Sequence, residues 1–537
     1  MKSKTSTDYV PLHKPNQILC GSGKIAIVTG WTPKEAIAKY LSPTEYAAIG
    51  ALYSPSRGIN FLLRNLIANP HLEMLVLLEA TKEDKNAGSV VCLMDFFKKG
   101  FHLGQSDTRR TCWVINSPIK GYVDSEISSD ALEKVREHFS GNRLIYTDTP
   151  ESAISMVRLL SSKQVNEATL YWSPVQFPIP DVKTTIYPGP RYGHRIEGAT
   201  IAETWIKILH RIRQTGTLRP TGYDGNWQEL VDLMAVVTDE PEEFYFPEPN
   251  YLPCDRQTVD QYIPQILEDK PYQPGVKYNY AQRMRSWFGQ DQIEAIIRKL
   301  IGEIDSASAV INLWDSGGVA HHPATGRRDG DSDHQHGGSP CLTNIWVRIV
   351  DRELSLTAIF RSNDMFGAWC SNAMGLRALQ HYILAEYCMR VQCHLDGEMD
   401  LPYPVDSNAP RTLKMGPLIT ISQSAHCYDD TFESCDRIIE QYYPEIVKNE
   451  LKCYHDACGN FVIEILNDRK IKVSQVTTYS GDLVREYQGS NPLVIGRKIV
   501  EDNPAIAPSH ALYLGLELQK AATCNKKGSA YSQDCPV

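Results

Sequence analysis

The sequence predicts an α+β protein in three parts: an α/β domain at residues 1–185, a central α+β domain at 190–440 and a small α+β domain at 441–537. Strand and helix patterns alternate near the start of the chain, whereas pairs of strand patterns precede helices further on. The chain has 537 residues, and single cores seldom extend beyond about 250 residues. A polar, proline-rich stretch at 173–190 predicts a linker at 180–195.

The first part carries the α/β pattern. Residues 24–30 (KIAIVTG) and 74–80 (MLVLLEA) predict short buried strands, and residues 59–69 (INFLLRNLIAN) predict a helix between them. The GSGK at 21–24 precedes its strand and lacks the remaining Walker spacing. We therefore expect a plain loop there, and not a phosphate-binding loop.

The central part opens with helix patterns. Apolar residues at helical spacing predict helices from Trp205 to Ile212, from Trp227 to Val237 and over residues 290–302. Residues 309–315 predict a strand, and the following loop at 317–338 is rich in glycine, histidine and aspartate. These side chains could bind a metal, but no regular spacing fixes their geometry, so we expect a mobile, solvated loop that would also suit a lid.

The pattern then becomes more regular. Residues 344–350 and 354–360 predict two strands joined by a tight turn, and the second strand ends at Arg361 and Ser362. A long amphipathic helix is predicted from Asn372 to Val391.

The last part predicts strands at 459–466 and 471–476 and a final helix at 510–521. Two cysteines flank His455, but no second pair stands at the spacing of a structural zinc site. We expect no metal there.

Composition narrows the class of function. The net charge of -9 gives no basic footprint for a nucleic-acid polymer, although a mononucleotide needs only a local basic pocket. No apolar stretch has the length of a signal-peptide core at the start, or of a membrane span later. The 14 cysteines are scattered, as in a reducing compartment, so we expect a cytoplasmic protein.

Three short segments point to the chemistry. They are Pro340-Cys341, RSNDMFGAWCSN from Arg361 to Asn372, and SAHCY from Ser424 to Tyr428. Together they resemble the thymidylate synthase family, which has its nucleophile in a Pro-Cys step, an R-S-x-D motif at a strand end, an asparagine eleven residues after the arginine and a later H-x-Y. The resemblance implies a mixed sheet with helices packed on one face, and a homodimer formed through the other face.

The residues themselves suit this chemistry. Adding a thiolate at C6 of uracil makes C5 nucleophilic, so Cys341 is the candidate nucleophile. The guanidinium of Arg361 would favour the thiolate and hold a phosphate, with Ser362 beside it as a further substrate contact. Asn372 offers one donor and one acceptor, which matches the N3–H and O4 edge of uracil.

The resemblance implies further roles. His426 and Tyr428 would bind the ribose 3′-hydroxyl, and Asp364 would contact the folate side of the site. WQELVDLM at 227–234 is similar to the helix that carries the family's catalytic glutamate, which makes Glu229 the candidate proton relay at O4. RIRQTGT is similar to its phosphate-binding loop and makes Arg213 the candidate phosphate contact.

Alternatives for the phosphate contact are Arg211 and Arg219. The paired arginines that the family carries before its tryptophan strand are replaced by Ala307 and Ser308. Arg327 and Arg328, in the histidine-rich loop, are candidates to substitute for them. Leu342 stands where the family commonly has histidine, which we regard as tolerable.

The flanks resemble other families. Residues 59–78 look like the A-type component of the tetrahydromethanopterin methyltransferase and its relatives, and residues 459–466 with 509–521 look like an uncharacterised domain often found with it. No histidine near residues 78–90 suggests a corrinoid ligand, so cobalamin is not predicted.

The sequence thus predicts an enzyme that methylates dUMP to dTMP, with methylenetetrahydrofolate or a related pterin as cosubstrate and without a metal. Hydroxymethylation of the same base, and a catalytically silent nucleotide-binding protein, are the alternatives. The expected state is a homodimer that binds a dUMP-type nucleotide and neither a nucleic-acid polymer nor a membrane.

Overall fold

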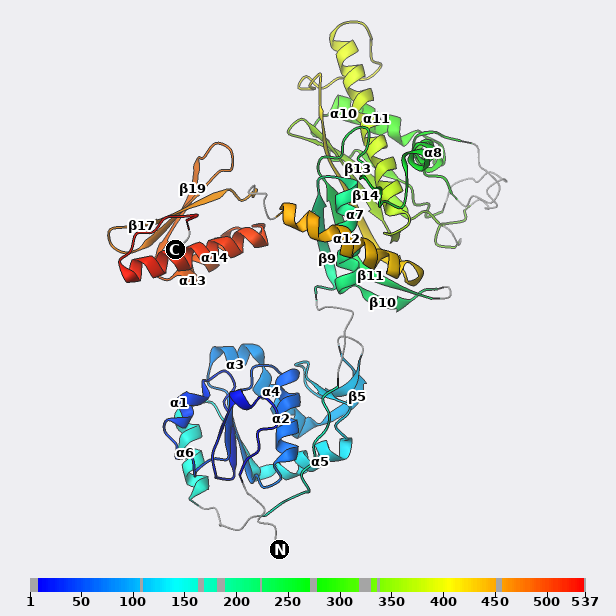
Figure 1. Cartoon of the computed structure of the whole chain (residues 1–537). Helices are drawn as coiled ribbons and strands as arrows, with labels where there is room; N and C mark the ends of the chain where they lie inside the picture. The colour runs from blue at the N-terminus through cyan, green and yellow to red at the C-terminus, as the bar shows by residue number, and fades with distance from the viewer. Residues whose placement is uncertain are drawn as a thin grey trace. The chain divides into compact units, whose positions relative to one another are not determined.

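The computed structural model of the chain describes residues 8–106, 110–162, 169–180, 189–222, 225–270, 278–317, 330–335, 339–450 and 456–535. The chain divides into two compact units, residues 1–184 and 185–537, and the second contains a central and a C-terminal part (Figure 1). No helix in these ranges is long and apolar enough to cross a membrane.

The first unit is built on a five-stranded sheet with the order β1-β3-β2-β4-β8, in which β2, β3, β4 and β8 are parallel. The sheet strands are β1 (Ile18–Cys20), β2 (Ile25–Val28), β3 (Ala48–Gly50), β4 (Met74–Leu78) and β8 (Leu144–Thr147). The helices are α1 (Lys34–Ala38), α2 (Arg57–Ala68), α3 (Lys82–Ala87), α4 (Ser89–Lys99), α5 (Ser129–His138) and α6 (Pro150–Ser161). A second, antiparallel sheet contains β5 (Phe101–Gln105), β6 (Thr111–Ile115) and β7 (Tyr122–Asp124).

These elements confirm the α/β pattern of the first part. β2 is buried at all four positions, as its uninterrupted apolar run predicts for a strand covered on both faces. The backbone N–H groups of Gly21, Ser22 and Gly23 donate to backbone carbonyls of residues 43–47. The GSGK segment is therefore a structural loop whose amides are already used.

The central part is a mixed sheet with the order β10-β11-β16-β14-β13-β12, to which β9 and β15 add at β11 and β16. Its strands are β9 (Tyr192–Gly198), β10 (Thr217–Pro220), β11 (Asn226–Val237), β12 (Val310–Asn312), β13 (Leu342–Val350), β14 (Glu353–Phe360), β15 (Asn363–Asp364) and β16 (Lys414–Tyr428). Its helices are α7 (Ile201–Thr215), α8 (Arg256–Leu267), α9 (Tyr280–Arg285), α10 (Gln292–Gly302), α11 (Trp369–Leu395) and α12 (Phe432–Glu450).

One predicted element of this part was wrong. The segment from Trp227 to Val237 is not a helix but the strand β11, which pairs with β16 over ten positions and with β9 on its other edge. Its apolar spacing is compatible with a helix or a strand. The hydrogen-bonded pairing with β16 and β9 makes it a strand. β9 begins at Tyr192, within the predicted linker, and the predicted boundary at residue 440 falls inside α12.

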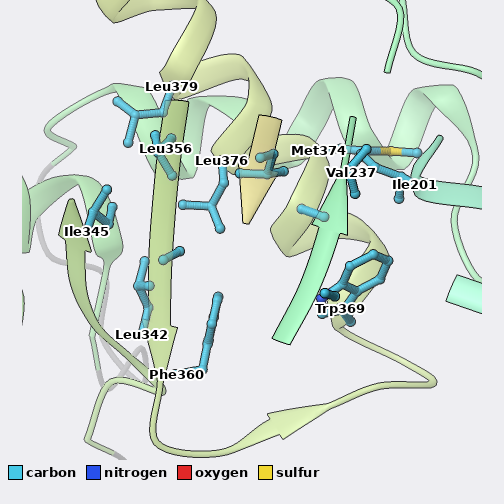
Figure 2. Packing of buried hydrophobic residues seen from close by; sticks show 14 of the residues in the cluster. Ile201, Val237, Leu342, Ile345, Leu356, Phe360, Trp369, Met374, Leu376 and Leu379 are labelled. Atoms are coloured by element: carbon cyan, nitrogen blue, oxygen red, sulfur yellow. The ribbon is translucent and has the colours of Figure 1, made fainter. Parts of the chain in front are cut away.

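The β13–β14 hairpin and α11 confirm their predictions. The hairpin turns at Asp351 and Arg352, whose φ angles of 51° and 65° are those of a two-residue type I′ turn. The buried face of α11 packs on the sheet, and Figure 2 shows this core with side chains from β13, β14 and α11, including Leu342, Ile345, Leu356, Phe360, Leu376 and Leu379.

The C-terminal part is a small α+β unit. An antiparallel sheet of β17 (Asn460–Ile465), β18 (Ile471–Val476) and β19 (Leu483–Gly489) packs against α13 (Pro492–Asp502) and α14 (Pro508–Lys527). The alternating burial of β17 and β18 matches their period-two apolar pattern.

Candidate functional site

A cavity of about 790 Å³ opens in the central part, where the end of β14, the start of α11 and the end of β16 meet. The described residues that line it are Gln261, Tyr262, Gln265, Lys270, Tyr278, Asn279, Tyr280, Cys341, Ser362, Asn363, Asp364, Gly367, Ala368, Ser371, Asn372, His426 and Tyr428. This volume lies within the range of about 300–1,000 Å³ that is usual for small-molecule sites. Six of the nine first-choice candidates from the sequence line this one cavity: Cys341, Ser362, Asp364, Asn372, His426 and Tyr428.

Cys341 lies at the point where the chain enters β13 and is partly buried. Arg361, at the end of the neighbouring β14, donates from Nε to the carbonyl oxygen of Pro340 at 3.1 Å and from Nη2 to that of Ser339 at 2.8 Å. Its backbone N–H donates to the Cys341 carbonyl at 2.9 Å. Arg361 is not among the described lining residues, but its hydrogen bonds fix the backbone that presents the thiol.

Three tyrosines surround the thiol, and the sequence analysis missed them. They are Tyr262 on α8, Tyr278 just before α9, and Tyr280 at the start of α9. Burial raises the pKa of each phenol above its ordinary value, and the nearby Cys341 charge raises that of Tyr278 further. The phenols therefore remain protonated donors at physiological pH.

Asn372 is held by a chain of buried polar groups. Its Oδ1 accepts from the Tyr262 hydroxyl at 2.5 Å, and its Nδ2 donates to Asn363 Oδ1 at 3.4 Å. Asn363 in turn donates from Nδ2 to Ser422 Oγ at 3.3 Å. Each end of the Asn372 amide thus has one protein partner, which leaves one donor and one acceptor for a ligand.

A glycine brings Tyr262 within reach of Asn372. Gly375 lies one turn after Asn372 on α11, and a Cβ there would lie 2.8 Å from Ile266 and 3.1 Å from the Tyr262 ring. Because glycine has no side chain, α8 can approach α11 closely at this point. The contact between the two helices therefore positions the asparagine.

His426 and Tyr428 project from the end of β16. The ring centroids of His426 and Trp227 are 4.3 Å apart, and burial lowers the pKa of His426 below its usual value despite the nearby Asp364 carboxylate. Asp364 accepts from the backbone N–H groups of Phe366 and Gly367 at 3.0 and 3.1 Å, which fixes the turn before α11.

Glu229 is not among the described residues that line the cavity. It stands on β11 opposite His426, and its Oε1 accepts from Ser424 Oγ at 2.6 Å. Ser424 Oγ is also 3.2 Å from His426 Nδ1. Arg219 Nε lies 2.9 Å from the other Glu229 oxygen. The expected helix around Glu229 is corrected to a strand, and its carboxylate is linked to the cavity through Ser424 and His426.

Arg213 also lies outside the described cavity lining. Its guanidinium makes two hydrogen bonds to the Asp436 carboxylate, at 2.7 and 2.8 Å, and a third to Gln228. A phosphate at Arg213 would therefore compete with Asp436 for the guanidinium. Lys270, which the sequence analysis did not single out, is the cation that the described lining contains, and its Nζ lies 3.2 Å from Glu268.

The replaced arginine pair and the histidine-rich loop give little further information. Ser308 bonds within its own turn to Ser306, and Arg327 and Arg328 lie outside the described residues. His455 is outside them as well. Among the residues that are described, no group of three or more His, Cys, Asp or Glu side chains is placed to hold a metal ion.

Part of the chain is homologous to proteins named "Putative thymidylate synthase". The one from Methanosarcina barkeri is 25% identical over 249 residues, which are 46% of this chain and 95% of that protein. The one from Methanococcoides burtonii is 26% identical over 253 residues, with 46% and 95% covered. The one from Methanopyrus kandleri is 29% identical over 190 residues, with 35% and 82% covered.

Two further similarities were found. Thermostable thymidylate synthase A from Bacillus subtilis aligns in structure with a TM-score of 0.30 at 14% identity, over 45% of this chain and 84% of that one. A sequence-family model described as PterinBD-DUF4346 matches residues 455–534. The relatives confirm the resemblance of the central part to thymidylate synthases, whereas the resemblances of the two flanks stay predictions.

Proposed function

We propose that the chain transfers a one-carbon unit from methylenetetrahydrofolate, or a related pterin, to C5 of dUMP and so forms dTMP. The observation that supports this most directly is the shared cavity of Cys341, Asn372, His426 and Tyr428, four residues that come from three distant segments of the chain. The pterin-related family model at residues 455–534 supports a folate-type cosubstrate.

In the proposed reaction the Cys341 thiolate attacks C6 of the base, which moves the electron pair of the C5–C6 bond to C5. C5 then bonds to the methylene carbon of the donor. Loss of the C5 proton and cleavage of the bond from this carbon to the donor nitrogen give an exocyclic methylene. A hydride from the pterin reduces it to methyl while Cys341 leaves as thiolate.

The other side chains of the site have distinct proposed roles. Asn372 binds N3–H and O4 with its free donor and acceptor, and His426 and Tyr428 bind the ribose. Glu229 acts as the proton relay towards O4, and its carboxylate is linked to the cavity by Ser424 and His426 along contacts of 2.6 and 3.2 Å. Tyr278, which lines the cavity with Cys341, donates a hydrogen bond to the sulfur during the attack.

We propose that the phosphate is held by Arg361, with Ser362 beside it, and by Arg213 once the nucleotide displaces Asp436. Asp364 contacts the pterin from the turn before α11. A homodimer in the cytoplasm is the state in which we expect this reaction to occur.

Hydroxymethylation of dUMP uses the same residues up to the exocyclic methylene, which water then attacks in place of hydride. The hydroxyl-rich wall formed by Tyr262, Tyr278 and Tyr280 favours this second candidate, because it offers hydrogen bonds to a water near Cys341.

Mass spectrometry of the nucleotide after incubation with dUMP and methylenetetrahydrofolate tests the proposal. We expect the mass of one added methyl group, its loss in Cys341→Ser, and its retention in Cys388→Ser, a partly buried cysteine outside the cavity lining. A hydroxymethyl product would select the second candidate.

Covalent trapping by 5-fluoro-dUMP separates both enzymes from a silent nucleotide-binding protein. The two enzymes should form a stable adduct on Cys341, visible as a mass shift of the intact chain. If neither a product nor an adduct forms, both catalytic proposals are contradicted.

A further inference from the structure

The first unit contains a cavity of its own, remote in sequence from the thiol site. It measures about 400 Å³ and lies between residues 9–18, the strands β2 and β3 with the loop that follows β3, and the first turns of α2. Crevices at the carboxyl ends of parallel strands are the usual ligand sites of open α/β sheets. We propose that this cavity binds a small amphipathic anion, with an aromatic or apolar body and a carboxylate, sulfonate or phosphate at one end.

The floor of the cavity is apolar. Side chains from β2, the loop after β3 and α2 form it: Ala26, Val28, Leu52, Phe61, Leu62 and Leu66. All of these except Phe61 are part of the hydrophobic core or packed against it. A ligand body that covers this floor gains roughly 25 cal/mol for each Å² of apolar surface removed from water.

The rim is cationic. Lys14 Nζ and the Arg57 guanidinium carbon each lie 5.3 Å from the centroid of the Phe61 ring. His13 lies at the same rim, with its ring centroid 5.8 Å from that of Phe61, but burial and the Arg64 charge lower its pKa, so it adds no positive charge at neutral pH. The described lining residues include no aspartate or glutamate, so the positive charge at the rim has no counterion within the cavity.

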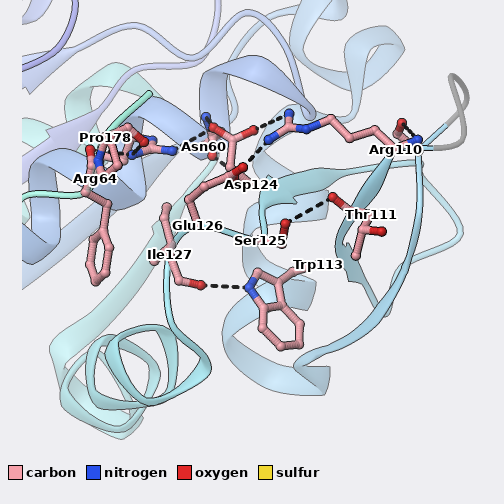
Figure 3. Close-up of polar contacts among 12 residues, drawn as sticks. Asn60, Arg64, Arg110, Thr111, Trp113, Asp124, Ser125, Glu126, Ile127 and Pro178 are labelled. Atoms are coloured by element: carbon pink, nitrogen blue, oxygen red, sulfur yellow. Dashed lines mark hydrogen bonds and ion pairs between the residues drawn. The ribbon is translucent and has the colours of Figure 1, made fainter. Parts of the chain in front are cut away.

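The nearest buried carboxylate is already neutralised by other arginines. Asp124 lies 2.7 Å from Arg64 Nη2 and 2.9 Å from Arg110 Nη1, and Asn60 Nδ2 donates to it at 2.9 Å (Figure 3). Arg57 Nη1 is 3.8 Å away and the Arg57 side chain is 58% exposed. Asp124 therefore fixes two other guanidiniums and leaves the charge of Arg57 available to a ligand.

These two features together define the ligand class. An inorganic anion would use the rim but leave the apolar floor in contact with water, and a neutral apolar molecule would desolvate Lys14 and Arg57 without pairing their charges. An aromatic anion satisfies both, because its ring can lie over the floor beside Phe61 while its acid group meets the cations.

A matched pair of fluorescent probes tests this on the full chain. 8-Anilinonaphthalene-1-sulfonate carries a sulfonate, and N-phenyl-1-naphthylamine has the same ring system without it. We expect the double variant Lys14→Gln/Arg57→Gln to weaken binding of the anionic probe at least about tenfold and to change binding of the neutral probe less than about twofold, as for lost charge-assisted contacts.

Lys39→Gln is the matched control, because Lys39 Nζ also stands over an aromatic ring, at 4.7 Å from that of Tyr40, but lies outside the cavity lining. It should leave both probes unaffected. If the double variant does not fold, the single variants Lys14→Gln and Arg57→Gln should each weaken the anionic probe severalfold. Equal affinities of wild type and variants for the anionic probe, or equal losses for both probes, would overturn the proposal.

Discussion

Tyr262 decides which way the Asn372 amide faces, and this gives a residue-scale prediction. With its Oδ1 held by the Tyr262 hydroxyl at 2.5 Å, the amide presents the donor and acceptor that uracil needs, whereas cytosine needs them exchanged. Tyr262→Phe should therefore lower the preference for dUMP over dCMP by about tenfold or more, since sites built on hydrogen bonds discriminate strongly. Dissociation constants of the two nucleotides, measured by calorimetry, give the ratio.

Tyr278→Phe is the control for this change. Tyr278 lines the same cavity, and we propose that it donates to the Cys341 sulfur, so its loss should slow adduct formation and leave the dUMP:dCMP ratio unchanged. If both variants lose dUMP affinity without a change in the ratio, Tyr262 has only a structural role.

His426 gives a pH dependence at the same scale. Burial lowers its pKa below the value near 6.5 of an exposed histidine, so between the folded pKa and about pH 6.5 the unfolded chain binds a proton that the folded chain does not. The free energy of unfolding should fall as the pH drops from about 7 through the folded pKa, by at most about 1.4 kcal/mol per pH unit for one group. Urea denaturation between pH 5.5 and 7.5 should show a smaller slope for His426→Gln than for wild type.

Substitution of an exposed histidine serves as the comparison. His102 is solvent-exposed on β5, and His102→Gln should keep the wild-type slope. Identical slopes in all three proteins would mean that His426 is protonated to the same degree in the folded and unfolded chain.

At the scale of elements, α11 carries both the core and the site, so a cavity in its buried face should destabilise the central part. Leu379 is fully buried against the sheet, and Leu379→Ala should cost about 2–5 kcal/mol. Met389→Ala on the exposed face of the same helix should change stability by less than about 0.5 kcal/mol. The urea transition that nucleotide binding stabilises reports on this part of the chain.

The elements also show what periodicity can and cannot predict. The buried stripe of α11 and the alternating hairpin strands were predicted because each has a single compatible period. β11 was not, because Leu230, Leu233 and Val237 suit a helix as well as a strand, and the ladders to β16 and β9 that decide the matter are long-range contacts.

The same reasoning explains the site. Cys341, Asn372 and His426 could be predicted from the sequence because fixed motifs carry them, and all three line the cavity. Tyr262 and Tyr278 belong to no motif spacing, and Tyr262 reaches the site only because Gly375 allows α8 to pack closely on α11. The partners of Arg213 could not be predicted, since Asp436 is more than two hundred residues away in sequence.

At the scale of the whole molecule, the outer face of the central sheet predicts self-association. The helix side of β13 is buried, whereas Trp346 and Val350 on its other side are 45% and 54% exposed, and Val310 of β12 stands opposite Trp346 with 42% exposed. Ile359 of β14 and Ile419 of β16 are only partly buried. Arg348 of β13 is also exposed on this side, so the apolar residues form a patch within a mixed face; such a patch is typical of a protein interface and supports the proposed homodimer.

A charge in the middle of this face should break the dimer. We expect light scattering on the wild-type chain to give twice the chain mass of 60.5 kDa, and Trp346→Glu to give the monomer mass, because a symmetric contact would bury the new carboxylate of each protomer without a partner. Leu395→Glu is matched in exposure, at 47%, but lies at the end of α11, and it should remain dimeric. A wild-type chain that is monomeric at micromolar concentration, or a Trp346→Glu variant that stays dimeric, would show that this face is not the interface.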